Sequence, residues 1–345
     1  MNLPPPVTNT NYNKIQTTVY SRIQLQTQQS ISDAAKRLFN IVEMEEPDNI
    51  DVTDADNRCA KVSVTVDGTW QRRGHSSKNG VVFVMSTRTG EALDYVVKTL
   101  HCQRCVYFKN KFIDDSEAFQ TWYNEHKESC YINHQGSSDS METQGTKEMF
   151  LRSMEHKLKY TTFVGDGDRS SYGVTAEACF EVYGEAYEVV KEECVGHIQK
   201  RMGSRLRELK RKKQGLKLSD GKSVGGKGRL TDKVVDKIQN FFGQAIRRNT
   251  GDQAGMKKNI WAIFHHMIIN DKESLEIQHD LCPKKDTWCK FWANKENYSE
   301  KNRLPHVFRE LLKPIFTDLT KDELLKRCLL GHTCLLYTSP SPRDS

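Results

Sequence analysis

The sequence lacks long apolar runs. None of its 345 residues falls in a stretch of eighteen consecutive apolar residues, so no membrane-spanning helix is predicted. The N-terminus also lacks the basic and apolar segments of a secretory leader, and we do not expect secretion. Only 37% of the residues are hydrophobic and the mean hydropathy is -0.70, but the length suffices for one large domain with insertions or for two domains.

A disulfide framework is also lacking, because the ten cysteines are unevenly spread. Several lie two or three residues from another Cys or His, which indicates zinc in a reducing compartment. Within residues 101–135, two chelating pairs predict one structural Cys₃His zinc site. Its ligands would be Cys102, Cys105, Cys130 and His134. The alternative is that these are ordinary buried cysteines.

A second zinc site is the weaker of the two zinc hypotheses, since pairing between distant segments cannot be inferred from spacing. It would combine Cys194 and His197 with His279 and Cys282, and would tie a later segment of the chain back to the sheet.

Two β-prone segments end in an acidic residue followed by glycine. Residues 61–66 alternate valine with polar residues and lead into Asp67, and residues 160–164 lead into Asp166 and Asp168. An Asp-Gly pair after a strand is also an ordinary turn signal. If the two strands are neighbours, Asp67 and Asp166, or Asp168 in its place, could share Mg²⁺ or Mn²⁺.

The order of the predicted elements indicates the fold class. Residues 1–29 are rich in Asn, Gln, Thr and Pro and are expected to form a flexible polar lead-in. A helix then precedes three strands, a helix, a strand, a helix and a strand. This is the order of a ribonuclease H-like (RNase H-like) domain, an α/β fold with a mixed sheet flanked by helices, predicted over residues 30–197. In that arrangement the first and fourth strands are neighbours.

Acidic residues are nearly absent between residues 198 and 230, where a basic helix over 200–213 precedes a glycine- and lysine-rich loop. Such a run can be a plain solvated face. We favour a contact with the DNA backbone, and the run could also act as a nuclear localisation signal. Residues 198–331 are predicted to form a basic, mostly helical insertion. The candidate DNA-binding residues are Arg72, Arg73, Lys200, Arg201, Arg205, Arg207, Lys210, Arg211, Lys212 and Lys213.

Four stretches together carry a family resemblance. They are Val66–His75, Phe163–Asp168, Glu193–Gly203 and His279–Pro283. In them the chain resembles the Mutator-like transposase domain of animal genomes, a DDE transposase, from about residue 30 to residue 331.

The resemblance implies roles for particular residues. Asp67 matches the first catalytic aspartate and Asp166 the second, with Asp168 as its rival, while Cys194 and His197 match a Cys-x-x-His feature of such transposases. The implied activity is metal-dependent cleavage of DNA at transposon ends and strand transfer into target DNA. A homo-oligomer is compatible with this activity.

The third carboxylate of the family, a glutamate, has no convincing match, because neither Glu310 nor Glu323 has the expected context. Residues 334–345 back-translate into a sequence that resembles a transposon-end adapter used for sequencing libraries, so we exclude them from the natural protein. We expect the natural chain to continue past Gly331 and the glutamate to lie there. Two alternatives stay open: a domesticated, non-catalytic, zinc-dependent DNA-binding protein, and an RNase H-like nuclease that only hydrolyses.

Overall fold

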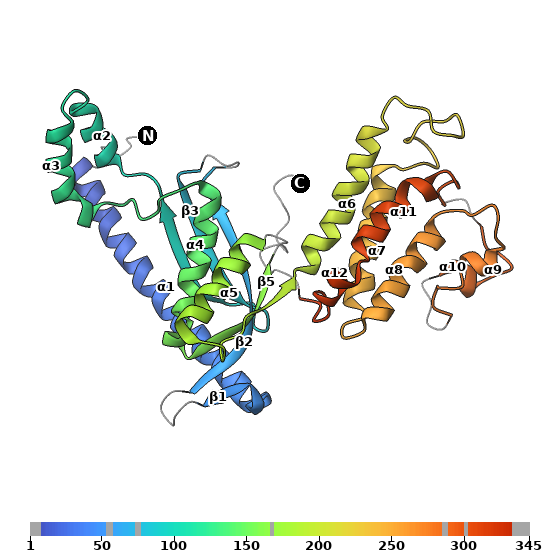
Figure 1. Ribbon diagram of the computed structural model, residues 1–345, viewed down its shortest axis with the longest axis horizontal. Coiled ribbons are helices and arrows are strands. Elements are labelled where there is room, and N and C mark those ends of the chain that lie inside the picture. The colour runs from blue at the N-terminus through green and yellow to red at the C-terminus, as the bar shows by residue number, and fades with distance from the viewer. Residues whose placement is uncertain are drawn as a thin grey trace, which may run out of the picture. The chain divides into compact units, whose positions relative to one another are not determined.

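The computed structural model describes residues 8–52, 58–72, 77–165, 169–284, 289–299 and 303–332. The chain divides into two compact units, shown in Figure 1. The first unit comprises Met1–Phe163 and Asp168–Val190, and the second comprises Val164–Gly167 and Lys191–Ser345.

The sheet has the strand order β4-β3-β2-β5-β6, and the short β1 pairs with β2. The ladders β1–β2, β2–β3 and β3–β4 are antiparallel. The strands are β1 (Ile50–Val52), β2 (Arg58–Trp70), β3 (Asn79–Ser86), β4 (Ala92–Thr99), β5 (Leu158–Gly165) and β6 (Val190–Glu193). The two strands with predicted acidic ends, β2 and β5, are therefore neighbours, as the element order predicts.

Helices of the first unit cover both faces of its strands (Figure 1). Gly145 of α4 (Ser138–Leu151) lies against Val82 on one face. Phe83 points to the opposite face, because side chains alternate along a strand, and lines a hollow there with Ala34 of α1 (Asn9–Glu45). The remaining helical elements of this unit are α2 (Gln103–Lys111), α3 (Ser116–His126), α5 (Arg169–Tyr183), and the 3₁₀ turns Pro47–Asn49, Lys127–Ser129 and Ser153–His156.

The N-terminal segment differs from the prediction of a flexible lead-in over residues 1–29. Helix α1 runs from Asn9 to Glu45 and begins at a side-chain cap from Thr8. No glycine or proline interrupts residues 9–45, and threonine and serine hydroxyls in the first half donate to the carbonyl four residues earlier. Only the second half packs, through the predicted apolar face of Ala34, Ala35, Leu38 and Val42.

The second unit is helical around one aromatic and aliphatic core. Phe242, Phe264, Phe308 and Phe316 are almost completely buried in it. Its helices are α6 (Val195–Lys212), α7 (Asp232–Arg247), α8 (Gln253–Met267), α9 (Leu275–Gln278), α10 (Lys290–Ala293), α11 (Phe308–Leu319) and α12 (Asp322–Lys326). Among the described residues of the whole chain, no helix combines the length and apolarity needed to cross a bilayer.

Two glycines, Gly68 and Gly80, leave room for the indole of Trp70 against the sheet. Trp70 is paired with Gly80 across the β2–β3 ladder. A Cβ atom at Gly80 would come within 1.9 Å of the Trp70 ring, and one at Gly68 within 3.2 Å. The Asp-Gly-Thr-Trp motif therefore has a packing role at the end of β2, because its glycine and tryptophan contact each other.

We therefore expect Gly80→Ala to destabilise the first unit by about 1–3 kcal/mol, because the new methyl group must push the indole from its place. Urea unfolding followed by circular dichroism measures the change. Gly173→Ala in α5 is the matched control: apart from the adjoining backbone of its own helix, no atom lies within 4 Å of its new Cβ, and alanine should stabilise the helix by about 0.5–1 kcal/mol. Equal stability of the Gly80→Ala variant and the unmodified chain would contradict this packing.

Candidate functional site

The first candidate metal centre lies where α2 and α3 meet. Cys102, Cys105, His126 and Cys130 each place one ligand atom within 4.8 Å of the others. Cys102 Sγ is 3.4 Å from His126 Nε2, and Cys105 Sγ is 3.4 Å from Cys130 Sγ, far longer than a disulfide bond of about 2.05 Å. Zinc bonded to sulfur at about 2.3 Å and to nitrogen at about 2.0 Å holds its tetrahedral ligands about 3.3–3.8 Å apart. The separations fit zinc.

Neighbouring side chains and backbone groups orient His126 and favour the thiolate form of Cys102. The Ser129 hydroxyl lies 3.3 Å from His126 Nδ1, which leaves Nε2 for the metal, and the Trp122 ring stacks on His126 at 4.6 Å. Burial alone would raise the pKa of Cys102, but backbone N–H groups of Cys105 and Tyr131 and the His126 ring lower it to about 6. A thiolate is the form that binds metal.

His134 is not the fourth ligand that the sequence predicts at this centre. Its Nε2 atom lies 2.8 Å from the Ser140 hydroxyl, at the start of α4. His126 takes the place because the last turn of α3 returns the chain to Cys102. Three residues separate His126 from Cys130, a spacing that is also typical of zinc ligands and could have identified His126. The same spacing between Cys130 and His134 made His134 an equally good candidate from the sequence alone.

The second candidate centre has two histidines and two cysteines: His266, His279, Cys282 and Cys289. Their ligand atoms form the edges of a compact tetrahedron. His266 Nδ1 and His279 Nδ1 are 3.2 Å apart, Cys289 Sγ lies 3.4 Å from His279 Nδ1, and Cys282 Sγ lies 3.8 Å from both imidazoles. These lengths again match the edges of a tetrahedral zinc site.

Neighbouring groups hold this second centre in place. Burial lowers the pKa of His266, which favours the neutral imidazole that metals bind. The Cys289 thiol has its pKa lowered through its contacts with Cys282 and the two imidazoles. The Arg303 guanidinium donates to the backbone carbonyl of His266 at 3.0 Å and fixes the end of α8.

The prediction that Cys194 and His197 join His279 and Cys282 is wrong. Cys194 lies at the start of α6, where its backbone N–H donates to the Gly165 carbonyl at 3.1 Å. His266 and Cys289 complete the second centre instead. His266 could not be recognised as a ligand from the sequence, because it lies in an apolar helix whose pattern is typical of core residues.

The acidic strand ends are partly described. Asp67 is half-buried near the end of β2, opposite Phe83 in the β2–β3 ladder. Asp166 and Asp168 lie outside the described residues, directly after the end of β5 at Gly165. The Glu142 carboxylate of α4 would be 3.3 Å from a Cβ atom at Gly68, so a further carboxylate, missed by the sequence analysis, lies beside this strand.

Most cations predicted to contact DNA from α6 form ion pairs within the second unit. The pairs are Arg205 with Asp318, Arg207 with Asp236, Lys210 with Asp232, and Arg211 and Lys212 with Glu208. Arg201 lies 3.4 Å from the buried carboxylate of Glu193. Lys200 is exposed on α6 and Arg72 is exposed after β2, while Arg73 lies outside the described residues.

The glycine- and lysine-rich loop after α6 is built around a buried arginine. Arg229 pairs with Asp220, donates to the Ser223 carbonyl at 2.9 Å and lies over the Phe308 ring. This packing leaves Lys217, Lys222 and Lys227 exposed. Among the described residues, no carboxylate forms an ion pair with any of these three lysines.

These features define an α/β protein with two Cys/His clusters, each of which could bind zinc. A family model for Mutator-like transposase matches residues 1–289, and the chain belongs to the Mutator-like transposase family. Searches of curated proteins and of solved structures give no match.

The geometry of the first centre makes a direct prediction. The purified chain should carry two zinc ions, and His126→Ala or Cys105→Ser should reduce this to one, because a four-ligand structural site that loses one ligand binds zinc less tightly. His134→Ala should keep both ions. Metal analysis by mass spectrometry distinguishes the two histidines.

At the second centre, His266→Ala should lose one ion and His197→Ala should lose none, which provides a matched pair. A loss of zinc from the His134 or His197 variant, with retention in the His126 or His266 variant, would contradict these ligand sets.

Proposed function

We propose that the chain is the DNA-binding and catalytic part of a DDE transposase with an RNase H-like sheet. The observation that carries this proposal is the strand order, in which β2, with Asp67 near its end, is adjacent to β5. Asp166 follows β5 in the sequence. Membership in the Mutator-like transposase family supports the same class of reaction.

The chemistry would be phosphoryl transfer on DNA. Bound Mg²⁺ or Mn²⁺ would activate the attacking oxygen and stabilise the leaving 3′ oxygen. Asp67 and Asp166, or Asp168, would supply carboxylate oxygens, the ligands that such hard cations prefer. The resemblance also implies a third carboxylate, a glutamate, for which the sequence offers no convincing match.

DNA affinity would come mainly from the loop after α6. The ion pairs along α6 neutralise much of the charge of that helix, whereas Lys217, Lys222 and Lys227 are exposed without such pairs in the described part of the chain. Lysines that contact phosphates release condensed counterions, which makes binding favourable and salt-dependent. Action on chromosomal DNA would place the protein in the nucleus.

A non-catalytic, zinc-dependent DNA-binding protein is the second candidate. The two Cys/His clusters and the lysine loop favour it, since neither feature needs an acidic site. The two proposals differ in whether Mg²⁺ binds at Asp67.

Replacing Lys217, Lys222 and Lys227 by Gln should weaken binding to duplex DNA and flatten its salt dependence by about 2–3 units of logarithmic slope. Fluorescence anisotropy over a range of salt concentrations measures both effects. The charge-matched control, Lys272, Lys313 and Lys326 to Gln, removes exposed lysines elsewhere in the second unit and should change the slope little. Equal slopes for the two triple variants would remove the loop from the interface.

Mg²⁺ should raise the melting temperature of the chain, and Asp67→Asn should abolish the rise by removing one anionic ligand. The effect should grow as pH increases, because two adjacent carboxylates must both lose their protons to hold the cation. Asp48→Asn, at an exposed acid of the same unit, is the control and should keep the rise. If Asp67→Asn retains the full rise, the acidic site is not at this strand end.

A further inference from the structure

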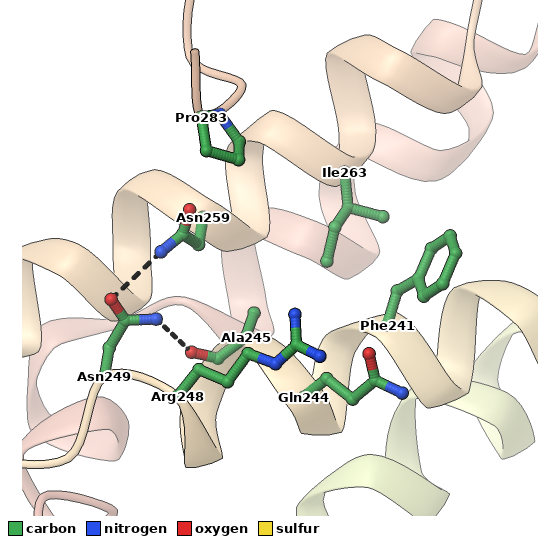
Figure 2. A pocket seen from close by; sticks show the side chains of 8 residues that line it. All are labelled: Phe241, Gln244, Ala245, Arg248, Asn249, Asn259, Ile263 and Pro283. Carbon is green, nitrogen blue, oxygen red and sulfur yellow. Dashed lines mark hydrogen bonds between the residues drawn. The ribbon is translucent and has the colours of Figure 1, made fainter. Parts of the chain in front are cut away.

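A pocket of about 300 Å³ lies between α7 and α8 of the second unit. Figure 2 shows Phe241, Gln244 and Arg248 along one side and Asn259, Ile263 and Pro283 facing them. The volume is at the lower end of ordinary small-molecule sites. Pro283 directly follows the metal ligand Cys282, so the second centre positions one wall.

Side-chain amides are concentrated and oriented in this pocket. Asn249 donates to the Ala245 carbonyl at 2.6 Å and accepts from Asn259 at 3.0 Å, as the dashed lines in Figure 2 show. Because Asn259 uses its NH₂ group in this bond, its carbonyl oxygen points away from Asn249 and is left as an acceptor. The Gln244 amide has no hydrogen-bond partner among the residues that the structure describes. The pocket therefore presents both donors and acceptors next to apolar walls.

The charge at the pocket is positive. Arg248 is exposed at its edge, and none of the described carboxylates forms an ion pair with it. Lys237 lies one turn before Phe241, with its ammonium group 5.5 Å from the ring centroid. Burial and the nearby Lys290 lower the pKa of Lys237. None of the described residues that line the pocket is acidic.

We propose that this pocket binds one unpaired nucleotide, with the base between the amides and the Phe241 ring and the phosphate on Arg248. A base has a flat apolar face and a polar edge, which match an aromatic ring beside Asn and Gln amides. A guanidinium binds a phosphate through two parallel hydrogen bonds. A purely apolar ligand would leave the amides unsatisfied, and an acidic peptide would make no use of the ring.

The nucleotide could be part of DNA, with its base swung out of the stacked strand. For this source, the inference rests on the proposed function. The other source with the same chemistry is a free nucleotide. The two are separated by using a DNA duplex with a single unpaired thymine, the same duplex fully paired, and thymidine 5′-monophosphate.

Fluorescence anisotropy should show that the full chain binds the duplex with the unpaired thymine about tenfold more tightly than the paired duplex. Gln244→Leu with Arg248→Gln should remove this preference. Both side chains are exposed, so the variant should fold. Lys258→Gln, an equal change of charge at an exposed residue outside the pocket, should keep the preference.

Saturation-transfer NMR with thymidine 5′-monophosphate provides the second measurement. A signal that the double variant loses and the Lys258 variant keeps supports nucleotide binding even if the chain binds no DNA, in which case the proposed function alone fails. If DNA binds without any preference for the unpaired thymine and the monophosphate gives no signal, the pocket is not a nucleotide site. If the double variant still prefers the duplex with the unpaired thymine, the proposed nucleotide site is also wrong.

Discussion

The segment between β4 and α4 has little apolar burial, and its convergent Cys and His side chains are the contact on which its fold depends. Helix α2 buries none of its residues, and α3 buries only His126. A helical hairpin of this size cannot remain folded on so little apolar burial. The aromatic stack of Phe108 on Trp122, with ring centroids 4.2 Å apart, is partly exposed and orients the helices without enclosing a core. The four ligand atoms lie close enough together to hold one ion, which would supply the missing cross-link.

The second candidate centre lies in another segment that has too little regular structure to be stable alone. The segment from α9 to α10 contains two four-residue helices, too short to be stable alone. His279 and Cys282 come from this segment, while His266 lies in the last turn of α8, so an ion shared among them would anchor the short helices to the main core. Pro283, next to Cys282 in the sequence, lines the pocket, so a bound ion would also link the second centre to the proposed nucleotide site.

Charge is used differently by α6 and by the loop that follows it. Arginine and lysine on α6 pair with carboxylates of α7 and α11, and so contribute to packing within the second unit. The loop turns back on the buried Arg229 and leaves its lysines exposed. A run of cations in a sequence does not distinguish these roles, because the partner carboxylates come from segments far along the chain.

Sequence patterns predicted the strands and the pairing of β2 with β5 well, but they predicted the ligand sets of the two candidate metal centres poorly. The alternating valines of β2 and the apolar face of α1 at Ala34 and Leu38 were correctly expected. The cysteine pair at Cys102 and Cys105 was also located correctly, since both ligands lie within one turn. His126 and His266 were missed, because each reaches its centre through tertiary folding. The helix from Asn9 was missed because its first half has no buried face.

The ligand sets of the two centres are the most direct test of this account, and X-ray absorption at the zinc edge measures them. The structure predicts three sulfur ligands and one nitrogen ligand at the first centre, and two of each at the second. The measured average over both ions should therefore be five sulfur ligands to three nitrogen ligands. Bond lengths should be about 2.3 Å to sulfur and about 2.0 Å to nitrogen. A shell of oxygen and nitrogen alone, or a chain that folds fully without bound metal, would contradict it.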